Sequence, residues 1–434
     1  MASSATSSSL SNLLTRFISF PISFGTSIVL AKVLGPDLRG TLSYLLLFHS
    51  FSMPILNLGL GTGVTFFISK KDYSADSTYF TSLLIALIQG VFGSILLFVF
   101  WKTSFLLTEE FIVDFSELLP LLILIPLNAI LFYTERTLIG KSQFIFINYM
   151  TLLQPILYLS SISVIYFFGQ ITVISVLYCI LFYNSVRTVI SVVKVLKQIN
   201  IQLSWNKLFI KQILSYGLKG WFGRLALAFN LRIDQFFLGS ISSYFLGVYV
   251  IAVQLAEIIW IIPDSLGPVL FNQISAEKDE SKQLMLVEKI HRILFFLVGF
   301  LAIAAGVIGF VFIPVVFGEE YAGSVMPFLF ILPGIVMQTS VKILTKIFAG
   351  RGKIEYNSMI TLFGMGISVL LYYLLIPKYG VLGAAVGSSI GYSASSLLTY
   401  VIAVKQFKFN LTQFFTPKKS DFHWVKSKVL KKSI

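Results

Sequence analysis

Residues 30–51 read LAKVLGPDLRGTLSYLLLFHSF, and residues 236–257 read FFLGSISSYFLGVYVIAVQLAE. The two stretches are alike in their order of small, aromatic and aliphatic residues. Gly40 of the first falls on Gly247 of the second, 207 positions later. A recurrence at a fixed distance is the sequence signature of a chain built from repeated units. The pair therefore suggests that the whole chain is a duplication.

The rest of the chain keeps almost the same distance. Segments 124–144 and 331–353 correspond, as do segments 167–179 and 377–389. The matching residues within them are Pro126 with Pro333 at a distance of 207, Gly140 with Gly350 at 210, and Gly169 with Gly380 at 211. So small a drift over half the chain is hard to obtain by chance, and duplicated halves are common in transporters. The sequence therefore predicts two related halves.

The composition predicts that both halves lie in a membrane. Of the 434 residues, 56% are hydrophobic and only 12% are charged. Apolar runs of about 20 residues or more recur along the chain, each long enough to cross a bilayer as a helix. We predict twelve spans: 11–34, 41–69, 76–101, 117–139, 143–168, 170–194, 212–239, 243–275, 289–314, 325–349, 355–377 and 380–404.

Twelve spans divide evenly between the two halves. Because six is an even number, the two halves enter the membrane in the same orientation and form parallel repeats. The predicted fold is therefore an all-α polytopic membrane protein. Its expected parts are an N-terminal six-helix lobe (1–194), a basic linker (195–211), a C-terminal six-helix lobe (212–404) and a basic tail (405–434).

The basic residues predict the orientation. About two thirds of the 33 lysines and arginines fall in the tail and in the loops that follow even-numbered spans. Loops rich in Lys and Arg stay in the cytoplasm, so both termini are expected to be cytoplasmic. The net charge of +14 then reflects this asymmetry and does not indicate a nucleic-acid partner. The tail is expected to lie on anionic lipid, with docking to a partner protein as the alternative.

Several kinds of chemistry are missing from the sequence. Cys179 is the single cysteine, and the three histidines, His49, His291 and His423, are scattered. No metal or cofactor site is expected. The segment GKS at 140–142 resembles a nucleotide-binding loop, but Glu135 stands where its first glycine should be. No predicted external loop is long enough for a hydrolase or transferase site, so transport without ATP is the expected activity.

Charged residues inside the spans are the candidates for a functional site. A charge at the centre of a spanning helix costs about 2.5–3.5 kcal/mol on insertion scales and usually faces a cavity. Arg224 lies near the middle of its predicted span. On a continuous helix, Lys219, Asn230 and Asp234 share one face and Arg224 adjoins it, which predicts a cavity wall.

Arg16 stands one position from repeat equivalence with Arg224. Each half would then place one arginine at similar depth on its first helix. Two guanidinium groups across a cleft suit a phosphate or diphosphate, which an arginine binds through two hydrogen bonds. The alternative is that each arginine pairs with a carboxylate and holds helices together.

The other intramembrane candidates are weaker. His49 and Glu257 are one position from repeat equivalence, and either could carry a proton or coordinate a cation; a packing role is the alternative for His49. Glu135 and Lys342 are secondary cavity candidates. Both lie close enough to a cytoplasmic end for their side chains to reach water instead.

Four stretches of the sequence resemble a known family: 30–47 with 57–69, 215–252, 316–336 and 377–392. They are similar to the Wzx-type polysaccharide repeat-unit flippases (O-antigen exporters) of the multidrug/oligosaccharidyl-lipid/polysaccharide exporter superfamily. The resemblance extends over nearly the whole chain and rests on patterns, with no single invariant signature.

The resemblance implies two six-helix lobes forming a V with a cationic central cavity in the bacterial cytoplasmic membrane. The implied activity is transfer of an undecaprenyl-diphosphate-linked oligosaccharide to the outer leaflet, driven by an H⁺ or Na⁺ gradient. Other membrane proteins of polysaccharide assembly are possible partners. Arg16 and Arg224 would be diphosphate ligands, and Asp234 in LRIDQFFLG would be the motif acid; Glu257 has no family motif behind it.

Three other classes of protein share some of these features. A multidrug and toxin extruder would have the same fold but an acidic, aromatic cavity. A membrane polymerase or ligase of a sugar pathway would need a large external loop. A major-facilitator sugar transporter would carry a glycine, an acid and several arginines between spans 2 and 3, where this chain reads KKDYSAD.

Overall fold

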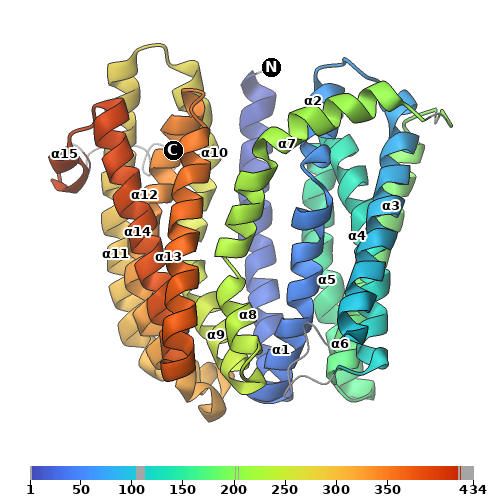
Figure 1. Ribbon diagram of the computed structural model, residues 1–434, viewed down its shortest axis with the longest axis horizontal. Coiled ribbons are helices and arrows are strands. Elements are labelled where there is room, and N and C mark those ends of the chain that lie inside the picture. The colour runs from blue at the N-terminus through green and yellow to red at the C-terminus, as the bar shows by residue number, and fades with distance from the viewer. Residues whose placement is uncertain (1, 104–112, 201, 204, 419–420, 422–434) are drawn as a thin grey trace, which may run out of the picture. The chain divides into compact units, whose positions relative to one another are not determined.

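The computed structural model describes residues 2–103, 113–200, 202–203, 205–418 and 421, and for residues 2–14 and 16 it describes the backbone alone. Every regular element in these ranges is a helix. The chain packs into two compact units, 1–248 and 249–434, so the boundary falls inside α9. The protein is an all-helical, multi-pass membrane protein (Figure 1).

The first unit contains α1 (Ala2–Leu56), α2 (Leu60–Ser69), α3 (Ala75–Lys102), α4 (Phe115–Gly140), α5 (Phe144–Phe168), α6 (Val173–Leu196), α7 (Lys207–Asn230), α8 (Ile233–Gly239) and the start of α9 (Ser243–Ile258). The second unit contains the rest of α9, α10 (Ile261–Ala276), α11 (Glu280–Phe317), the 3-10 helix η1 (Glu319–Ser324), α12 (Val325–Gly350), α13 (Glu355–Tyr379), α14 (Val381–Phe407) and α15 (Leu411–Phe415).

Helix α1 consists of two arms that fold back on each other. Gly35 has a φ of 67° and a ψ of 173°, outside the helical range. Arg39 Nη2 donates a hydrogen bond to Ser27 Oγ at 3.1 Å. Twelve residues of straight helix would separate these positions by about 18 Å, so the chain must reverse at Gly35 (Figure 1). The arms correspond to the first predicted span and most of the second.

Three further breaks interrupt predicted spans. Residues 57–59 separate the second arm of α1 from α2, and residues 231–232 separate α7 from α8. Helices α9 and α10 meet at a bend of 46°. The span predicted at 212–239 as one continuous helix is therefore two helices.

The predicted number of twelve spans is not confirmed. By length and composition, nine helices of the described residues can cross a membrane, or ten if α9 and α10 form one span. Helix α1 counts once in that number although its arms fold back on each other, and the charged α7 is not among the nine. The division into lobes at 195–211 also stays a prediction; in the structure, α7 already begins at Lys207.

The two units repeat the same set of helix contacts. In the first unit, α4 packs against α2, α3 and α6, and α5 packs against α6. In the second unit, α12 packs against α10, α11 and α14, and α13 packs against α14. These are the pairs that correspond when the sequence halves are superposed. The internal repeat read from the sequence is thus also a repeat of packing.

Within the first unit, residues 36–63 run antiparallel to residues 213–247. At one end, a side chain on Gly40 or Gly247 would collide with the opposite backbone. Towards the middle, the ring centroids of Phe51 and Phe229 are 4.6 Å apart. At the other end Gly59 meets Gly217. This seam, residues 36–63 against 213–247, brings the charged part of α7 onto the break between α1 and α2.

Candidate functional site

The candidate site is built on the turn at residues 57–59, between α1 and α2. Gly59 has a φ of 78°, the left-handed conformation that glycine adopts without strain. Its N–H donates to Asn57 Oδ1 at 2.7 Å. A side chain at Gly59 would also collide with the carbonyl of Gly217 on α7. Glycine is therefore needed both for the turn and for the close approach of α7.

Helix α7 is fixed on this turn by polar contacts. Trp221 Nε1 donates to the carbonyl oxygen of Pro54 at 2.7 Å, an acceptor in the last turn before the break. One helical turn further along, Arg224 Nη2 donates to the carbonyl oxygen of Gly217 at 3.3 Å. A Cβ atom on Gly59 would lie 2.7 Å from the same Nη2 atom. The guanidinium group of Arg224 thus rests directly on the glycine turn. Arg224 as a whole is exposed.

A second arginine, on α4, packs against the start of α2, directly after the turn. The side-chain stem of Arg136 packs against Gly61, where a Cβ would come within 3.2 Å of Cγ. Its guanidinium carbon lies 4.7 Å from the centre of the Phe132 ring. The carboxylate of Glu135 attracts the charge of Arg136, and the charge of Arg224 repels it. Arg224 of α7 and Arg136 of α4 therefore lie beside the turn and beside the start of α2 that follows it.

Neither arginine is neutralised by an ion pair in the part of the chain that the structure describes. Glu135 is next to Arg136 in sequence, but its carboxylate binds Arg187 at 2.7 Å. Like charges in a medium of low dielectric repel strongly. An anion between them would turn that repulsion into attraction, and phosphate groups match the planar guanidinium with two hydrogen bonds each. The turn with Arg136 and Arg224 is therefore a candidate anion site.

The polar face predicted for α7 is wrong in one respect. The prediction assumed that Lys219, Asn230 and Asp234 lie on one continuous helix, but α7 ends at Asn230 and Asp234 belongs to α8. Lys219 is exposed, whereas Asn230 and Asp234 are only 2% exposed. Asp234 Oδ1 accepts a hydrogen bond from the Gln235 N–H at 2.8 Å. The break after Asn230 thus places these residues in different surroundings.

Two other predicted residues of the first unit have hydrogen-bond partners. The amide nitrogen of Asn128 lies 2.8 Å from Nε2 of His49, so the half-buried ring is held by a neutral side chain. Glu135 forms the ion pair with Arg187, which also donates to the side chain of Gln154. Glu135 thereby holds α4 to α6, and its role as a cavity residue stays a prediction.

The predicted residues of the second unit lie near the bend between α9 and α10. Lys342 Nζ pairs with Asp264 Oδ1 at 2.7 Å and lies 4.3 Å from the centre of the Trp260 ring. Glu257 is half-buried on α9, one turn before the bend. Lys346 interacts electrostatically with both Asp264 and Lys342. Here the basic residues share a nearby carboxylate.

The remaining predicted residue is Arg16, whose side chain lies outside the described residues. Its role as a partner of Arg224 stays a prediction. Among the described residues, no group of three or more His, Cys, Asp or Glu side chains is arranged to hold a metal ion.

Arg136 is the residue that sequence reasoning missed. It lies near the cytoplasmic end of the predicted span 117–139, where a basic residue is expected. The repeat contained a signal for it, because the distance of 210 that joins Gly140 to Gly350 also joins Arg136 to Lys346. In the structure both side chains pack against a glycine, Arg136 against Gly61 of α2 and Lys346 against Gly267 of α10. Helices α2 and α10 correspond in the repeat.

Comparisons with known proteins agree with this architecture. The profile of a family described as "Polysaccharide biosynthesis protein" matches residues 29–326, more than half of the chain. No curated protein sequence matches the chain significantly.

Solved structures share the fold at low sequence identity. A multidrug-resistance MATE family transporter of the MOP superfamily in an inward-facing conformation is 18% identical, with a TM-score of 0.72 over 89% of this chain and 94% of its own. The lipid II flippase MurJ, in an inward closed conformation, is 13% identical, with a TM-score of 0.76 over 92% of this chain and 88% of its own. A MOP superfamily transporter from Pyrococcus furiosus is 17% identical, with a TM-score of 0.65 over 92% and 95% of the two chains.

Proposed function

Because the chain belongs to the family of polysaccharide biosynthesis proteins, we propose that it is a flippase for undecaprenyl-diphosphate-linked oligosaccharide repeat units. In this proposal it moves them across the bacterial cytoplasmic membrane for the synthesis of a cell-surface polysaccharide. It acts as a secondary-active transporter and not as an enzyme. The observation that carries the proposal is the pair of guanidinium groups of Arg136 and Arg224 beside the turn at residues 57–59, neither in a direct ion pair with a described residue.

A diphosphate meets the needs of this site. It brings more than one negative charge and enough oxygens for each arginine to form two hydrogen bonds. Hydrogen bonds to charged groups contribute about 1.5–3 kcal/mol each, enough to hold a head group at the turn. The exposed Arg224 gives that head group a point of entry. The sugar would then be held by its diphosphate, which is common to all such substrates, and the site would not have to recognise each oligosaccharide.

Coupling to an H⁺ or Na⁺ gradient is part of the same proposal. Asp234 is the preferred coupling group because it is a carboxyl group only 2% exposed, at the start of a short helix after a break. Broken helices are where transporters commonly bind coupling ions. His49 and Glu257 remain alternative groups. Both termini are proposed to be cytoplasmic, and other polysaccharide-assembly membrane proteins are proposed partners.

Transbilayer movement of the lipid-linked oligosaccharide in proteoliposomes tests the function. The unaltered protein is expected to flip the lipid faster when a proton or sodium gradient is imposed. Arg224→Ala and Arg136→Ala should each slow the movement about tenfold or more, whereas Arg136→Lys should retain more activity than Arg136→Ala because the charge remains. Asp234→Asn should move lipid at a rate that no longer responds to the gradient.

A multidrug antiporter is the competing function, since one of the similar structures is a multidrug-resistance transporter. Such a protein would export organic cations, which the paired arginines repel. Export of small cations by proteoliposomes that do not move the diphosphate lipid would replace the flippase proposal with this one.

A further inference from the structure

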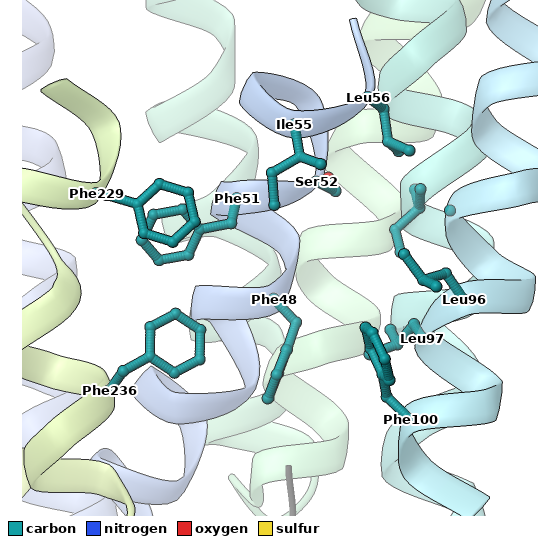
Figure 2. Close-up of a pocket in the computed structure, with 12 residues that line it drawn as sticks. Phe48, Phe51, Ser52, Ile55, Leu56, Leu96, Leu97, Phe100, Phe229 and Phe236 are labelled. Carbon is teal, nitrogen blue, oxygen red and sulfur yellow. The ribbon is translucent and has the colours of Figure 1, made fainter. Parts of the chain in front are cut away.

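The first unit contains an apolar pocket beside the seam, with a volume of about 160 Å³. Figure 2 shows its walls: Phe48, Phe51 and Ile55 come from the second arm of α1, and Leu96, Leu97 and Phe100 face them from α3. Phe229 of α7 and Phe236 of α8 close the third side. With Ile125 of α4, aromatic and aliphatic side chains of five helices line one small space.

The lining of the pocket excludes a polar occupant. Among its described lining residues, Ser52 has the one polar side chain. The Ser52 hydroxyl already donates to the carbonyl oxygen of His49 at 2.7 Å. A cavity of about 150 Å³ lined by Leu, Ile and Phe in another protein stays dry and binds benzene. A sugar or an ion would find no partner here, whereas a hydrocarbon group of five or six carbons fits.

The pocket and the anion site share helices α1, α4 and α7. Leu56 lines the pocket and directly precedes the turn at residues 57–59 on which Arg224 rests. On α7, Phe229 is twelve residues, or about 18 Å of helix, from Gly217, on whose carbonyl oxygen the Arg224 guanidinium rests. Leu56 is therefore the near wall of the pocket, and the prenyl group of a diphosphate bound at the turn would enter from that side.

The pocket is also close to the surface that faces lipid. Leu96 lines it, while the adjacent Ile95 on α3 is 57% exposed and Phe92 is 58% exposed. Large apolar side chains exposed on a membrane span are the ones that contact lipid chains. A hydrocarbon chain that leaves the pocket can therefore continue into the bilayer without crossing a polar region.

We propose that this pocket holds the isoprene unit next to the diphosphate of a polyprenyl lipid while Arg136 and Arg224 bind the diphosphate. The inference rests on the proposed function and names a second contact for the same substrate. The protein could then distinguish a prenyl diphosphate from other anions, because it would bind the charged group and the first branched five-carbon unit at the same time.

Two water-soluble probes test the proposal in lipid nanodiscs: inorganic diphosphate, and dimethylallyl diphosphate, which carries a single isoprene unit. Dimethylallyl diphosphate is expected to bind about tenfold tighter or more, because transfer of even part of a five-carbon group from water into an apolar site is worth at least that factor. Equal affinities of the unaltered protein for the two probes would overturn the inference and leave the flippase proposal standing. Failure of both probes to bind would overturn both.

A matched pair of variants on α3 locates the effect. Leu96→Phe fills the pocket, whereas Ile95→Phe makes the same addition one residue away on the exposed surface. Leu96→Phe should remove the advantage of dimethylallyl diphosphate and keep the affinity for inorganic diphosphate; Ile95→Phe should keep both. Ser52→Leu fills the pocket from the opposite wall and repeats the test if Leu96→Phe lowers the thermal stability. Retention of the advantage in both filled variants would contradict the proposal.

Photolabelling distinguishes a prenyl chain from ordinary membrane lipid. A photoreactive geranyl diphosphate should label peptides 48–56 and 93–100, and excess dimethylallyl diphosphate should prevent the labelling. A photoreactive phospholipid should not label these peptides above the level on the exposed face of α3. Equal labelling by the phospholipid would make the pocket a site for bulk lipid and overturn the inference.

Discussion

The two units place basic residues at corresponding positions on α4 and α12 but neutralise them differently. In the second unit Lys342 pairs with Asp264, which also attracts Lys346. Arg292 and Arg351 of that unit pair with Asp421 and Glu280. In the first unit the carboxylate of Glu135 forms its direct ion pair with Arg187; it attracts Arg136 without such a pair, and Arg224 repels Arg136.

This difference shows how a duplicated scaffold can gain a site without a new fold. The helix contacts are the same in both units. In each unit a glycine makes room for the basic residue, Gly61 of α2 for Arg136 and Gly267 of α10 for Lys346. The local counter-charge decides the outcome. Where a carboxylate is supplied from a neighbouring helix, the cation becomes structural; where it is not, the cation is available for an anionic ligand.

The largest expected effect comes from removing Arg136 and Arg224 together. The double variant Arg136→Ala/Arg224→Ala should weaken the binding of inorganic diphosphate in nanodiscs about 100-fold or more, because several charge-assisted hydrogen bonds are lost. Lys346→Ala, at the corresponding position of the second unit, should change the affinity less than about threefold. A comparable loss in Lys346→Ala would show that both units, and not only the first, bind the anion.

The next effect distinguishes Gly59, in the turn on which Arg224 rests, from Gly267, against which Lys346 packs. Gly59→Ala should lower the stability by about 2–4 kcal/mol, since it combines a positive φ with a collision against backbone. Gly267→Ala should change it by no more than about 1 kcal/mol, because its Cβ would meet only the mobile end of Lys346 at 3.0 Å and alanine favours a helix. Thermal unfolding in nanodiscs measures both. Equal losses would mean that the turn at 57–59 is not the tighter contact.

A smaller effect compares the two ion pairs. Glu135→Gln should destabilise the protein by about 2 kcal/mol, since Arg187 has a side chain only 12% exposed and would lose its counter-charge. Asp264→Asn should cost less than about 1 kcal/mol, because Asp264 is 45% exposed and water can replace it. The same unfolding measurement applies, and the reverse order would contradict the assignment of Glu135 as the more structural acid.

The sequence predicted the repeat, the helical class and the approximate position of most spans. Membrane helices can be located from the length of their apolar runs, and a duplication from the constant distance between matching residues. It did not predict the break after Asn230. Nothing in LALAFNLRIDQFF interrupts a helical pattern, and the break depends on packing of α7 and α8 along the seam. Because of this break, the prediction that Lys219, Asn230 and Asp234 share one face of a single helix was also wrong.

Which charges are neutralised was also out of reach of the sequence. The intramembrane cost of Arg224 marks it as functional from its position alone. Arg136 carries no such mark, because it lies near the end of its span, and its availability depends on where Glu135 points. The partners Glu135–Arg187 and Lys342–Asp264 are 52 and 78 residues apart, and only the folded chain brings such residues together.

The smallest expected effect concerns the ion pair between Arg292 and Asp421, the best-buried pair described in the second unit. We expect its contribution to stability to stay constant between pH 5 and 8. Asp421 accepts two hydrogen bonds from Arg292, at 2.6 and 2.9 Å, and these hydrogen bonds hold the pKa of the Asp421 carboxyl below its ordinary value. A carboxyl whose pKa is lowered by folding stabilises the folded state above its unfolded pKa of about 4, and that contribution is lost as the pH falls through the lower, folded value. The docking of α15 on α11, measured by limited proteolysis of the segment that carries α15, should therefore be constant from pH 8 to 5 and weaken only below about 4. Asp421→Asn should expose the segment at every pH. Release of the segment in the unaltered protein near pH 6 would mean that another group controls it, and the second unit's cations would then be less firmly paired than the comparison requires.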